Sequence, residues 1–262
     1  MSTDAAPASP LRNVRLTIEY DGTAYHGWQR QTNGLAVQQV LEEALERMVG
    51  PGAGVSGGRV AITAAGRTDA GVHAAAQVCH FHTTATLPLR AFVLGLNTYL
   101  PPDIAVKDAA EAPPDFHARR SARGKRYRYT VWEAPVRSAL RARTAWWVRP
   151  GLDREAMRGA ALPLVGEHDF SAFRGQGCEA KTSVRVVRAI ELGEPEPGLL
   201  VWDVSATAFL KHMVRNIIGT LVHVGRGKMT PAGVAAALES RDRRRAGPTA
   251  PPQGLCLMEV FY

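Results

Sequence analysis

The sequence contains few cysteines and no long apolar run. Its 262 residues include only three cysteines, Cys79, Cys178 and Cys256. Because they are few, odd in number and far apart, we expect reduced thiols and neither a disulfide framework nor a structural zinc site. No segment approaches the roughly 18 consecutive apolar residues of a membrane span. Residues 1–12 lack the basic and apolar regions of a secretory signal. We therefore expect a disordered arm there and a cytoplasmic protein.

Acidic residues are outnumbered by basic ones. Lys and Arg total 32 against 24 Asp and Glu, which gives a net charge of +8 and a pI near 9.8. A surplus of this kind favours a polyanionic partner. The charge clusters where basic residues alternate with Tyr127 and Tyr129, a mixture of phosphate-binding and base-stacking side chains. A solvated basic strand fits the cluster equally well. Its basic members are Arg119, Arg120, Arg123, Lys125, Arg126 and Arg128.

The first half of the chain has the pattern of a small α+β unit. Residues 13–20 alternate apolar and polar side chains, which predicts a half-buried strand. Residues 37–48 carry apolar side chains at helical spacing and are followed by Gly50 and Pro51, which predicts a helix and its end. Further patterns predict strands near 60–64, 77–83 and 104–109 and a helix near 89–96. The predicted order over residues 13–115 is β-α-β-β-α-β.

The second half, residues 116–262, repeats this order. The patterns predict strands at 125–132, 183–192, 199–206 and 255–262, and helices at 153–164, 213–222 and 231–240. Two consecutive β-α-β-β-α-β units indicate an α+β protein with two tandem ferredoxin-like halves, each an antiparallel sheet with helices on one face. The two sheets are expected to form one divided antiparallel sheet. Sheets of this kind commonly serve as RNA platforms.

The segment AAGRTDAGVHA at residues 64–74 concentrates small residues around one acid. Its glycines and alanines allow a backbone or a ligand to approach closely. Arg67, two residues from Asp69, could keep that carboxylate ionised and oriented, as a nucleophile or base requires. The same residues also fit a tight turn in which Asp69 caps local amides and Arg67 forms a surface ion pair.

Five strings in the sequence occur together in one family. They are EYDGTAYHGWQRQ at 19–31, AGRTDAGVHA at 65–74, DFHAR at 115–119, RYRY at 126–129 and HMVRNIIG at 212–219. In this order, spanning nearly the whole chain, they resemble the bacterial tRNA pseudouridine synthase A family. The resemblance implies the pseudouridine synthase fold, with two tandem ferredoxin-like halves and one divided sheet, which agrees with the predicted order of elements.

The resemblance also implies an activity and an active site. The activity is isomerisation of uridine to pseudouridine at positions 38, 39 and 40 of the tRNA anticodon stem-loop, with no organic cofactor and no metal. Asp69 matches the catalytic aspartate of the family, and Arg215 matches the arginine that pairs with it. Arg67 would position the loop and contact the flipped nucleotide, and Tyr127 would stack on the uracil and help remove the C5 proton. Attack by Asp69 on ribose C1′, attack on uracil C6 and electrostatic stabilisation all remain open.

A uridine within a stem must leave its stack, and a basic groove with aromatic surfaces can offset that cost. The candidates for this groove are Arg119, Arg123, Lys125, Arg126 and Arg128. Because side chains alternate along a strand, we expect only part of the basic run to contact phosphate. Trp28 and Arg30 are further candidates for tRNA contact, and for Trp28 packing beneath its loop is an equal alternative.

Other features favour structural roles. His80 and His82 share a strand face but have no convincing third ligand nearby, which argues against a metal site. His73 is expected to brace the loop through a hydrogen bond. The run 241–245 fits a solvated turn or a peripheral tRNA contact, and Lys211 is assigned no role.

Two other function classes compete with the isomerase. An RNA-binding module of two RRM-like halves would carry an aromatic RNP string, which the sequence lacks. A metal-dependent nuclease would need clustered carboxylates, but Asp69 has no acidic neighbour within ten residues. The sequence therefore favours a tRNA-modifying isomerase. The family resemblance further implies a homodimer bridged by tRNA.

Overall fold

The computed structural model describes residues 10–55 and 58–262, which divide into two compact units. Unit 1 comprises the described residues up to Thr68 together with Ala74–Ala122, and unit 2 comprises Asp69–His73 together with Arg123–Tyr262. Most of the predicted arm at 1–12 lies outside the described residues. The loop around Asp69 is thus divided: the chain leaves unit 1 after Thr68, and the next five residues belong to unit 2.

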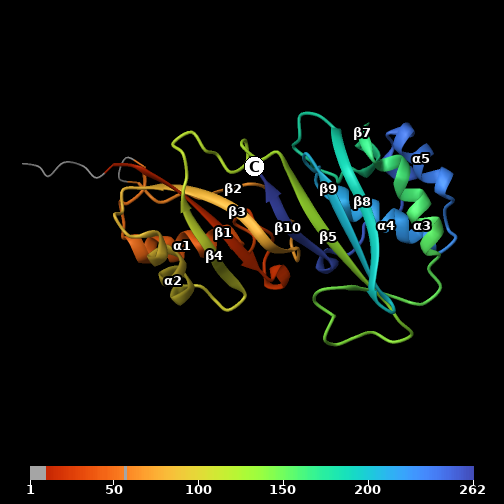
Figure 1. Ribbon diagram of the computed structural model, residues 1–262, viewed down its shortest axis with the longest axis horizontal. Coiled ribbons are helices and arrows are strands. Elements are labelled where there is room, and N and C mark those ends of the chain that lie inside the picture. Colours follow the sequence, from red (N-terminus) through yellow and green to blue (C-terminus); the bar gives the residue numbers. More distant parts are fainter. Residues whose placement is uncertain (1–9, 56–57) are drawn as a thin grey trace, which may run out of the picture. The chain divides into compact units, whose positions relative to one another are not determined.

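Unit 1 is built on an antiparallel sheet (Figure 1). Strand β1 pairs with both β3 and β4, and β2 pairs with β3, so the order is β4-β1-β3-β2. The elements alternate along the chain as the sequence predicts. They are β1 (Arg12–Tyr20), α1 (Val37–Val49), β2 (Thr63–Ala64), β3 (His73–Thr83), α2 (Leu89–Tyr99) and β4 (Ile104–Glu111).

The core of unit 1 follows from two periodicities. In β1 the alternating residues Val14, Leu16 and Ile18 are fully buried, as expected for a strand with one face on the core. In α1 the buried residues recur at helical spacing, and the helix ends at Gly50, whose φ is +81°. Phe81 of β3 and Phe92 of α2 meet edge to face, with ring centroids 5.4 Å apart. Burial of these apolar faces holds the helices on the sheet.

Unit 2 contains a second antiparallel sheet, ordered β10-β5-β9-β8-β7, with the short β6 parallel to β5. Helices α3, α4 and α5 contact one another and cluster in Figure 1. Sequence analysis missed β6 and β7, and the predicted helix at 153–164 ends as a 3₁₀ turn at Leu162–Leu164. The elements are β5 (Gly124–Glu133), β6 (Trp146–Val148), α3 (Arg154–Ala161), β7 (Gly166–Asp169), β8 (Val184–Glu196), β9 (Leu199–Ala206), α4 (Met213–Gly225), α5 (Pro231–Ser240) and β10 (Leu255–Phe261).

Helix α4 is the central element of the unit 2 core. Eleven of its thirteen residues are buried, so it packs on most of its circumference, as expected for an interior helix. Beneath it, β5 and β9 contribute Tyr129, Val131, Trp202 and Val204, all fully buried. This helix also carries the HMVRN string, so the core of unit 2 fixes the position of that motif.

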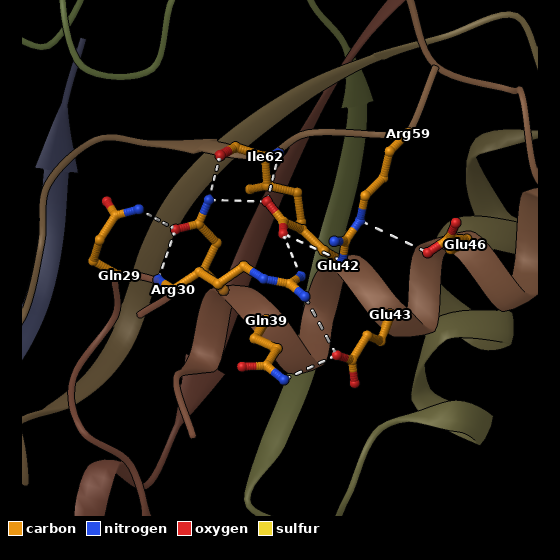
Figure 2. Close-up of polar contacts among 9 residues, drawn as sticks. Gln29, Arg30, Gln39, Glu42, Glu43, Glu46, Arg59 and Ile62 are labelled. Atoms are coloured by element: carbon orange, nitrogen blue, oxygen red, sulfur yellow. Dashed lines mark hydrogen bonds and ion pairs between the residues drawn. The ribbon is translucent and has the colours of Figure 1, made fainter. Parts of the chain in front are cut away.

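A buried carboxylate organises one side of unit 1 (Figure 2). Glu42 of α1 is 5% exposed, and Arg30 Nη1 donates to its Oε2 at 3.2 Å. Arg59 Nη2 lies 3.6 Å from the same oxygen, while Gln38 Nε2 and the Ile62 backbone N–H donate to Oε1 at 2.9 and 3.2 Å. One carboxylate therefore ties the loop at Arg30 and the chain entering β2 to helix α1.

A histidine cluster lies elsewhere in unit 1. The ring of His80 is 4% exposed and packs against those of His82, Phe116 and His117 at centroid distances of 5.1–5.8 Å. His80 Nδ1 accepts the Ala118 backbone N–H at 3.2 Å. Burial, followed by the charges of His117 and His82, lowers the pKa of His80 to about 4. His80 is therefore held in its neutral form.

Replacing Glu42 is expected to destabilise the fold. Glu42→Ala removes the acceptor of three hydrogen bonds and the ion-pair partner of Arg59, and should lower the unfolding free energy by about 1–3 kcal/mol, moderated because both arginines can turn to water. Urea denaturation measures the change. The matched control is Glu43→Gln on the same helix, whose carboxylate is half exposed and 3.9 Å from Arg30; it should shift stability by less than about 0.5 kcal/mol. Equal effects of the two variants would contradict the role of Glu42.

Acid should destabilise the protein through His80. Its pKa is lowered in the folded state, so the unfolded chain binds the proton more readily between about pH 6.5 and about pH 4. The stabilisation is present above pH 6.5 and is lost as the pH falls through this window, by up to about 3 kcal/mol. Denaturation midpoints measured across the window should fall less steeply for His80→Asn than for the unsubstituted protein. Parallel pH dependences would show that His80 is not responsible.

Candidate active site

The segment that leads to Asp69 is anchored within unit 1. The hydroxyls of Tyr20 and Thr68 are 2.8 Å apart, and the backbone N–H of Trp28 donates to the Thr68 carbonyl at 3.1 Å. The fully buried Gln77 donates from Nε2 to the Gly66 carbonyl at 2.9 Å. Three parts of unit 1, namely β1, the loop at Trp28 and β3, thus hold the chain up to Thr68.

The residues after Asp69 form a turn held within unit 2. The Val72 N–H donates to the Asp69 carbonyl at 3.1 Å, and Gly71 has a φ of +76°, a conformation that favours glycine. The buried His73 places Nε2 2.7 Å from the Arg143 carbonyl and 3.1 Å from the Gln253 carbonyl. The predicted bracing hydrogen bond of His73 is therefore confirmed.

The carboxylate of Asp69 faces two basic side chains of unit 2. Arg215 Nη1 donates to Asp69 Oδ2 at 3.1 Å, and His212 Nε2 lies 3.5 Å from the same oxygen. The Arg215 side chain is 13% exposed and that of Asp69 is 24% exposed. Arg215 is the partner that the motif predicts. The ion pair is shielded from water on the arginine side, while the carboxylate stays accessible.

Residues 246–250, which we call the strap, hold Arg215 in place. The Ala250 carbonyl accepts from Arg215 Nε at 2.8 Å, and the Ala250 N–H donates to the Arg215 carbonyl at 3.0 Å. Thr220 Oγ1 accepts the Gly247 N–H at 2.9 Å. A Cβ on Gly219 would lie 1.8 Å from the Pro248 carbonyl oxygen. Only glycine at this position of α4 lets the strap approach so closely.

The side chain of Asn216 links α4 to the 3₁₀ turn that ends at Phe173 and to the strap. It is fully buried and donates from Nδ2 to the Phe173 carbonyl at 2.8 Å. Its Oδ1 accepts from Thr249 Oγ1 at 2.6 Å and from Arg243 Nη2 at 3.1 Å. Arg243 is thus occupied in holding the strap, whereas Arg244 pairs with the adjacent Asp242 at 2.7 Å. At least one arginine of the run 241–245 is therefore structural.

Tyr127 lies on the core side of β5. It is 7% exposed, and its ring packs edge to face with Phe209, with centroids 5.1 Å apart. Phe209 lies in the segment that enters α4, three residues before His212. The next tyrosine of the string, Tyr129, donates its hydroxyl to the Pro251 carbonyl at 2.7 Å, and burial raises its pKa. Tyr127 therefore packs against the segment that leads to His212 and Arg215.

Arg126 and Arg128 lie on the opposite face of β5 from Tyr127, as the alternation along a strand requires. Arg128 makes a two-pronged contact with Asp203, at 3.0 and 2.8 Å, and Arg126 Nη2 donates to Glu259 at 3.2 Å. The hydrogen bond to Asp203 raises the pKa of Arg128. These arginines form cross-strand ion pairs, whereas Arg123, which directly precedes the strand, is exposed.

Two predicted contact residues belong to unit 1. Trp28 is 2% exposed, and its ring centroid lies 6.1 Å from that of Tyr20. This burial favours the alternative in which Trp28 packs beneath its loop. Arg67 is exposed in the segment just before Asp69. Contacts of Arg67 and Trp28 with RNA stay predictions.

Metal sites, membrane spans and disulfides are not found in the described part of the chain. Within residues 10–55 and 58–262, no three His, Cys, Asp or Glu side chains are grouped so that they could bind a metal ion. No helix in the same ranges has the length and apolar character to cross a membrane. Cys79 is buried, Cys178 and Cys256 are partly exposed, and all three are free thiols.

Sequence reasoning missed several residues that build this site. His212 stands in one of the five strings without an assigned role, and the strap carries no motif. Asn216 and Thr220 lie four residues apart within the apolar stripe of α4, where buried polar side chains signal a specific hydrogen-bonded partner. That signal is present in the sequence, but the identity of the partner is not.

Comparison with known proteins now assigns the chain to a family. Residues 16–119 and 160–262 match the sequence profile of the tRNA pseudouridine synthases. The chain belongs to the tRNA pseudouridine synthase family. It is 53% identical over 252 residues to the tRNA pseudouridine synthase A of Myxococcus xanthus, a match that covers 96% of this chain and 92% of that protein.

Other relatives agree with this assignment. The proteins of the same name from Pelobacter propionicus and Syntrophotalea carbinolica are 54% and 55% identical, over 96% and 95% of this chain and 100% and 96% of theirs. Among solved structures, a chain of a Cbf5-Nop10-Gar1 complex has a TM-score of 0.32 at 13% identity, covering 76% of this chain and 40% of that chain. That likeness is too weak to bear on the fold.

A side chain at position 219 is expected to displace the strap. The methyl group of Gly219→Ala would overlap the Pro248 carbonyl, so α4 and the strap must separate, at a cost of about 2 kcal/mol or more. Urea denaturation measures the loss. As a control, a Cβ on Gly159 of α3 would meet no other segment within 4 Å, and Gly159→Ala should be neutral or stabilising by up to about 1 kcal/mol. Unchanged stability of Gly219→Ala would contradict the close packing of the strap.

Proposed function

We propose that this protein isomerises uridine to pseudouridine at positions 38, 39 and 40 of the tRNA anticodon stem-loop, with Asp69 as the essential carboxylate. Membership of the tRNA pseudouridine synthase family makes it an isomerase that acts on tRNA. The match covers nearly the full length of this chain and of its relatives, which supports the whole activity. The observation that carries the role of Asp69 is its accessible carboxylate, held by the shielded Arg215 at 3.1 Å.

The chemistry needs few groups from the protein. The bond between uracil N1 and ribose C1′ breaks, a bond forms between C5 and C1′, C5 loses a proton and N1 gains one. Atoms and electrons therefore balance without a cofactor. The ionised Asp69 can act as a nucleophile or stabilise developing positive charge. Arg215 pairs with the carboxylate and holds it in place.

The remaining residues have supporting roles in this proposal. Tyr127 would stack on the uracil and assist removal of the C5 proton, and its packing against Phe209 supports a fixed ring. The exposed Arg67 and Arg123 would contact the RNA backbone. Contacts by Arg126, Arg128 and Trp28 stay predictions, with weaker support because these side chains are already paired or buried.

The same proposal extends to architecture and assembly. We infer that the chain consists of two tandem ferredoxin-like halves, 13–115 and 116–262, in one divided sheet. Two matching antiparallel orders support the halves: β4-β1-β3-β2 in unit 1 and β10-β5-β9-β8 in unit 2. The family resemblance supports a cytoplasmic homodimer bridged by tRNA.

The decisive experiment is tritium release from tRNA labelled with [5-³H]uridine. The unsubstituted protein should release tritium without added cofactor, because C5 loses its hydrogen when it bonds to C1′. Asp69→Asn and Asp69→Ala should reduce the rate by about 10³-fold or more while tRNA binding persists. Replacing uridine at positions 38, 39 and 40 one at a time identifies the reacting sites.

A matched control separates the role of Asp69 from a general loss of charge. Asp108 is an exposed carboxylate of β4, and Asp108→Asn should release tritium at the unsubstituted rate. If the unsubstituted protein binds anticodon stem-loops but releases no tritium, the isomerase proposal fails and a non-catalytic RNA-binding module becomes the better interpretation.

A further inference from the structure

His212 has a backbone conformation that is unfavourable for its residue type. Its φ and ψ are 60° and 3°, in the left-handed region, at the residue that caps the start of α4. Among the described residues, only His212 and Arg241 are non-glycine residues with positive φ. Such conformations persist where the surroundings enforce them, and they concentrate at functional sites. The conformation accompanies a ring whose Nε2 lies 3.5 Å from Asp69 Oδ2.

The ring of His212 is confined by Gly175. The Gly175 N–H donates to the Lys211 carbonyl at 2.8 Å, which holds the two segments together. A Cβ on Gly175 would lie 2.8–3.0 Å from His212 Nδ1, Cγ and Cβ. The ring therefore occupies the space that a side chain at Gly175 would need. Any larger residue there must push the imidazole out of its place.

The charges around His212 favour a neutral ring. Burial lowers the pKa of His212 most, Asp69 opposes this effect, and the cations Arg215, Lys211 and Arg243 lower the pKa further. Because Arg215 already pairs with Asp69, the resting site does not need a second cation. A neutral imidazole can still donate a hydrogen bond from Nε2. The 3.5 Å separation is long for such a bond in the free protein, and catalytic contacts often tighten when substrate binds.

We propose that His212 is a positioning residue for Asp69: together with Arg215 it fixes the carboxylate for reaction, and protonation of its ring would engage the carboxylate in a second ion pair. This inference rests on the proposed isomerase function. In this proposal His212 controls how the Asp69 carboxylate is oriented and whether it is free to react. His212 does not contribute to tRNA affinity. Acid inactivation should therefore follow the titration of His212.

The test compares three variants in single-turnover tritium release at saturating tRNA from pH 5 to 9. His212→Ala should lower the rate constant by about five- to tenfold at pH 8, the usual scale for losing one hydrogen-bonding partner, with an unchanged Kd for tRNA. Gly175→Ala should have the same effect, because it displaces the ring. His212→Gln keeps a donor that cannot titrate, so it should retain most of the rate and lose the decline in acid.

The control is His223→Gln, which replaces another histidine of α4 in its last turn and should leave both rate and pH profile unchanged. Denaturation midpoints establish that each variant is folded. An unchanged rate in His212→Ala, or an acid decline that persists in His212→Gln, would overturn the proposal. Absence of tritium release from the unsubstituted protein would instead contradict the isomerase function, so the two failures are distinguishable.

A second readout does not depend on turnover. The pKa of His212, measured by ¹H–¹⁵N NMR of the imidazole, should be lower in Asp69→Asn. The reason is that this variant lacks the carboxylate that stabilises the protonated ring. Asp108→Asn should leave the titration where it is. An identical titration in the unsubstituted protein and in Asp69→Asn would show that the two side chains do not interact, and it would overturn the proposal even in an inactive preparation.

Discussion

The ion pair between Asp69 and Arg215 sets the requirements for the candidate site, because a carboxylate can serve as a catalyst only if it is both held in place and reachable. Arg215 holds the Asp69 carboxylate at 3.1 Å while remaining largely shielded from water, and the carboxylate stays 24% exposed. The strap orients this guanidinium, since the Ala250 carbonyl occupies Arg215 Nε and leaves Nη1 for the carboxylate. The polar contacts of α4 with the strap thus serve to aim one guanidinium.

Local periodicity made much of the fold predictable. The alternation in β1 and the helical stripe of α1 reflect burial of one face, whereas α4 is buried around most of its circumference. Buried positions are apolar, so their spacing can be recognised in the sequence. Strands β6 and β7 contain only three and four residues, too few for a period to be recognised. Their pairing partners β5 and β8 lie beyond intervening loops, outside the short window in which a period can be read.

The candidate site was predictable to a different degree. Asp69 and Arg215 were found because their strings resemble those of a family, although 146 residues separate them. The contribution of His212 was not predictable, because it depends on a left-handed backbone and on the missing side chain of Gly175. Both are properties of packing between segments. For the arginines of β5 the sequence suggested more than the structure supports. The basic run predicted a phosphate-binding groove, but Arg126 and Arg128 are already paired with carboxylates.

Those ion pairs change what the net charge of +8 means for a polyanion. Arg126 and Arg128 are held by Asp203 and Glu259 on the sheet surface. A phosphate that engaged either arginine would have to displace a carboxylate and would release fewer counterions than an unpaired cation allows. The affinity for RNA should therefore depend on salt less steeply than the count of basic residues suggests, with recognition resting more on shape and stacking than on bulk attraction.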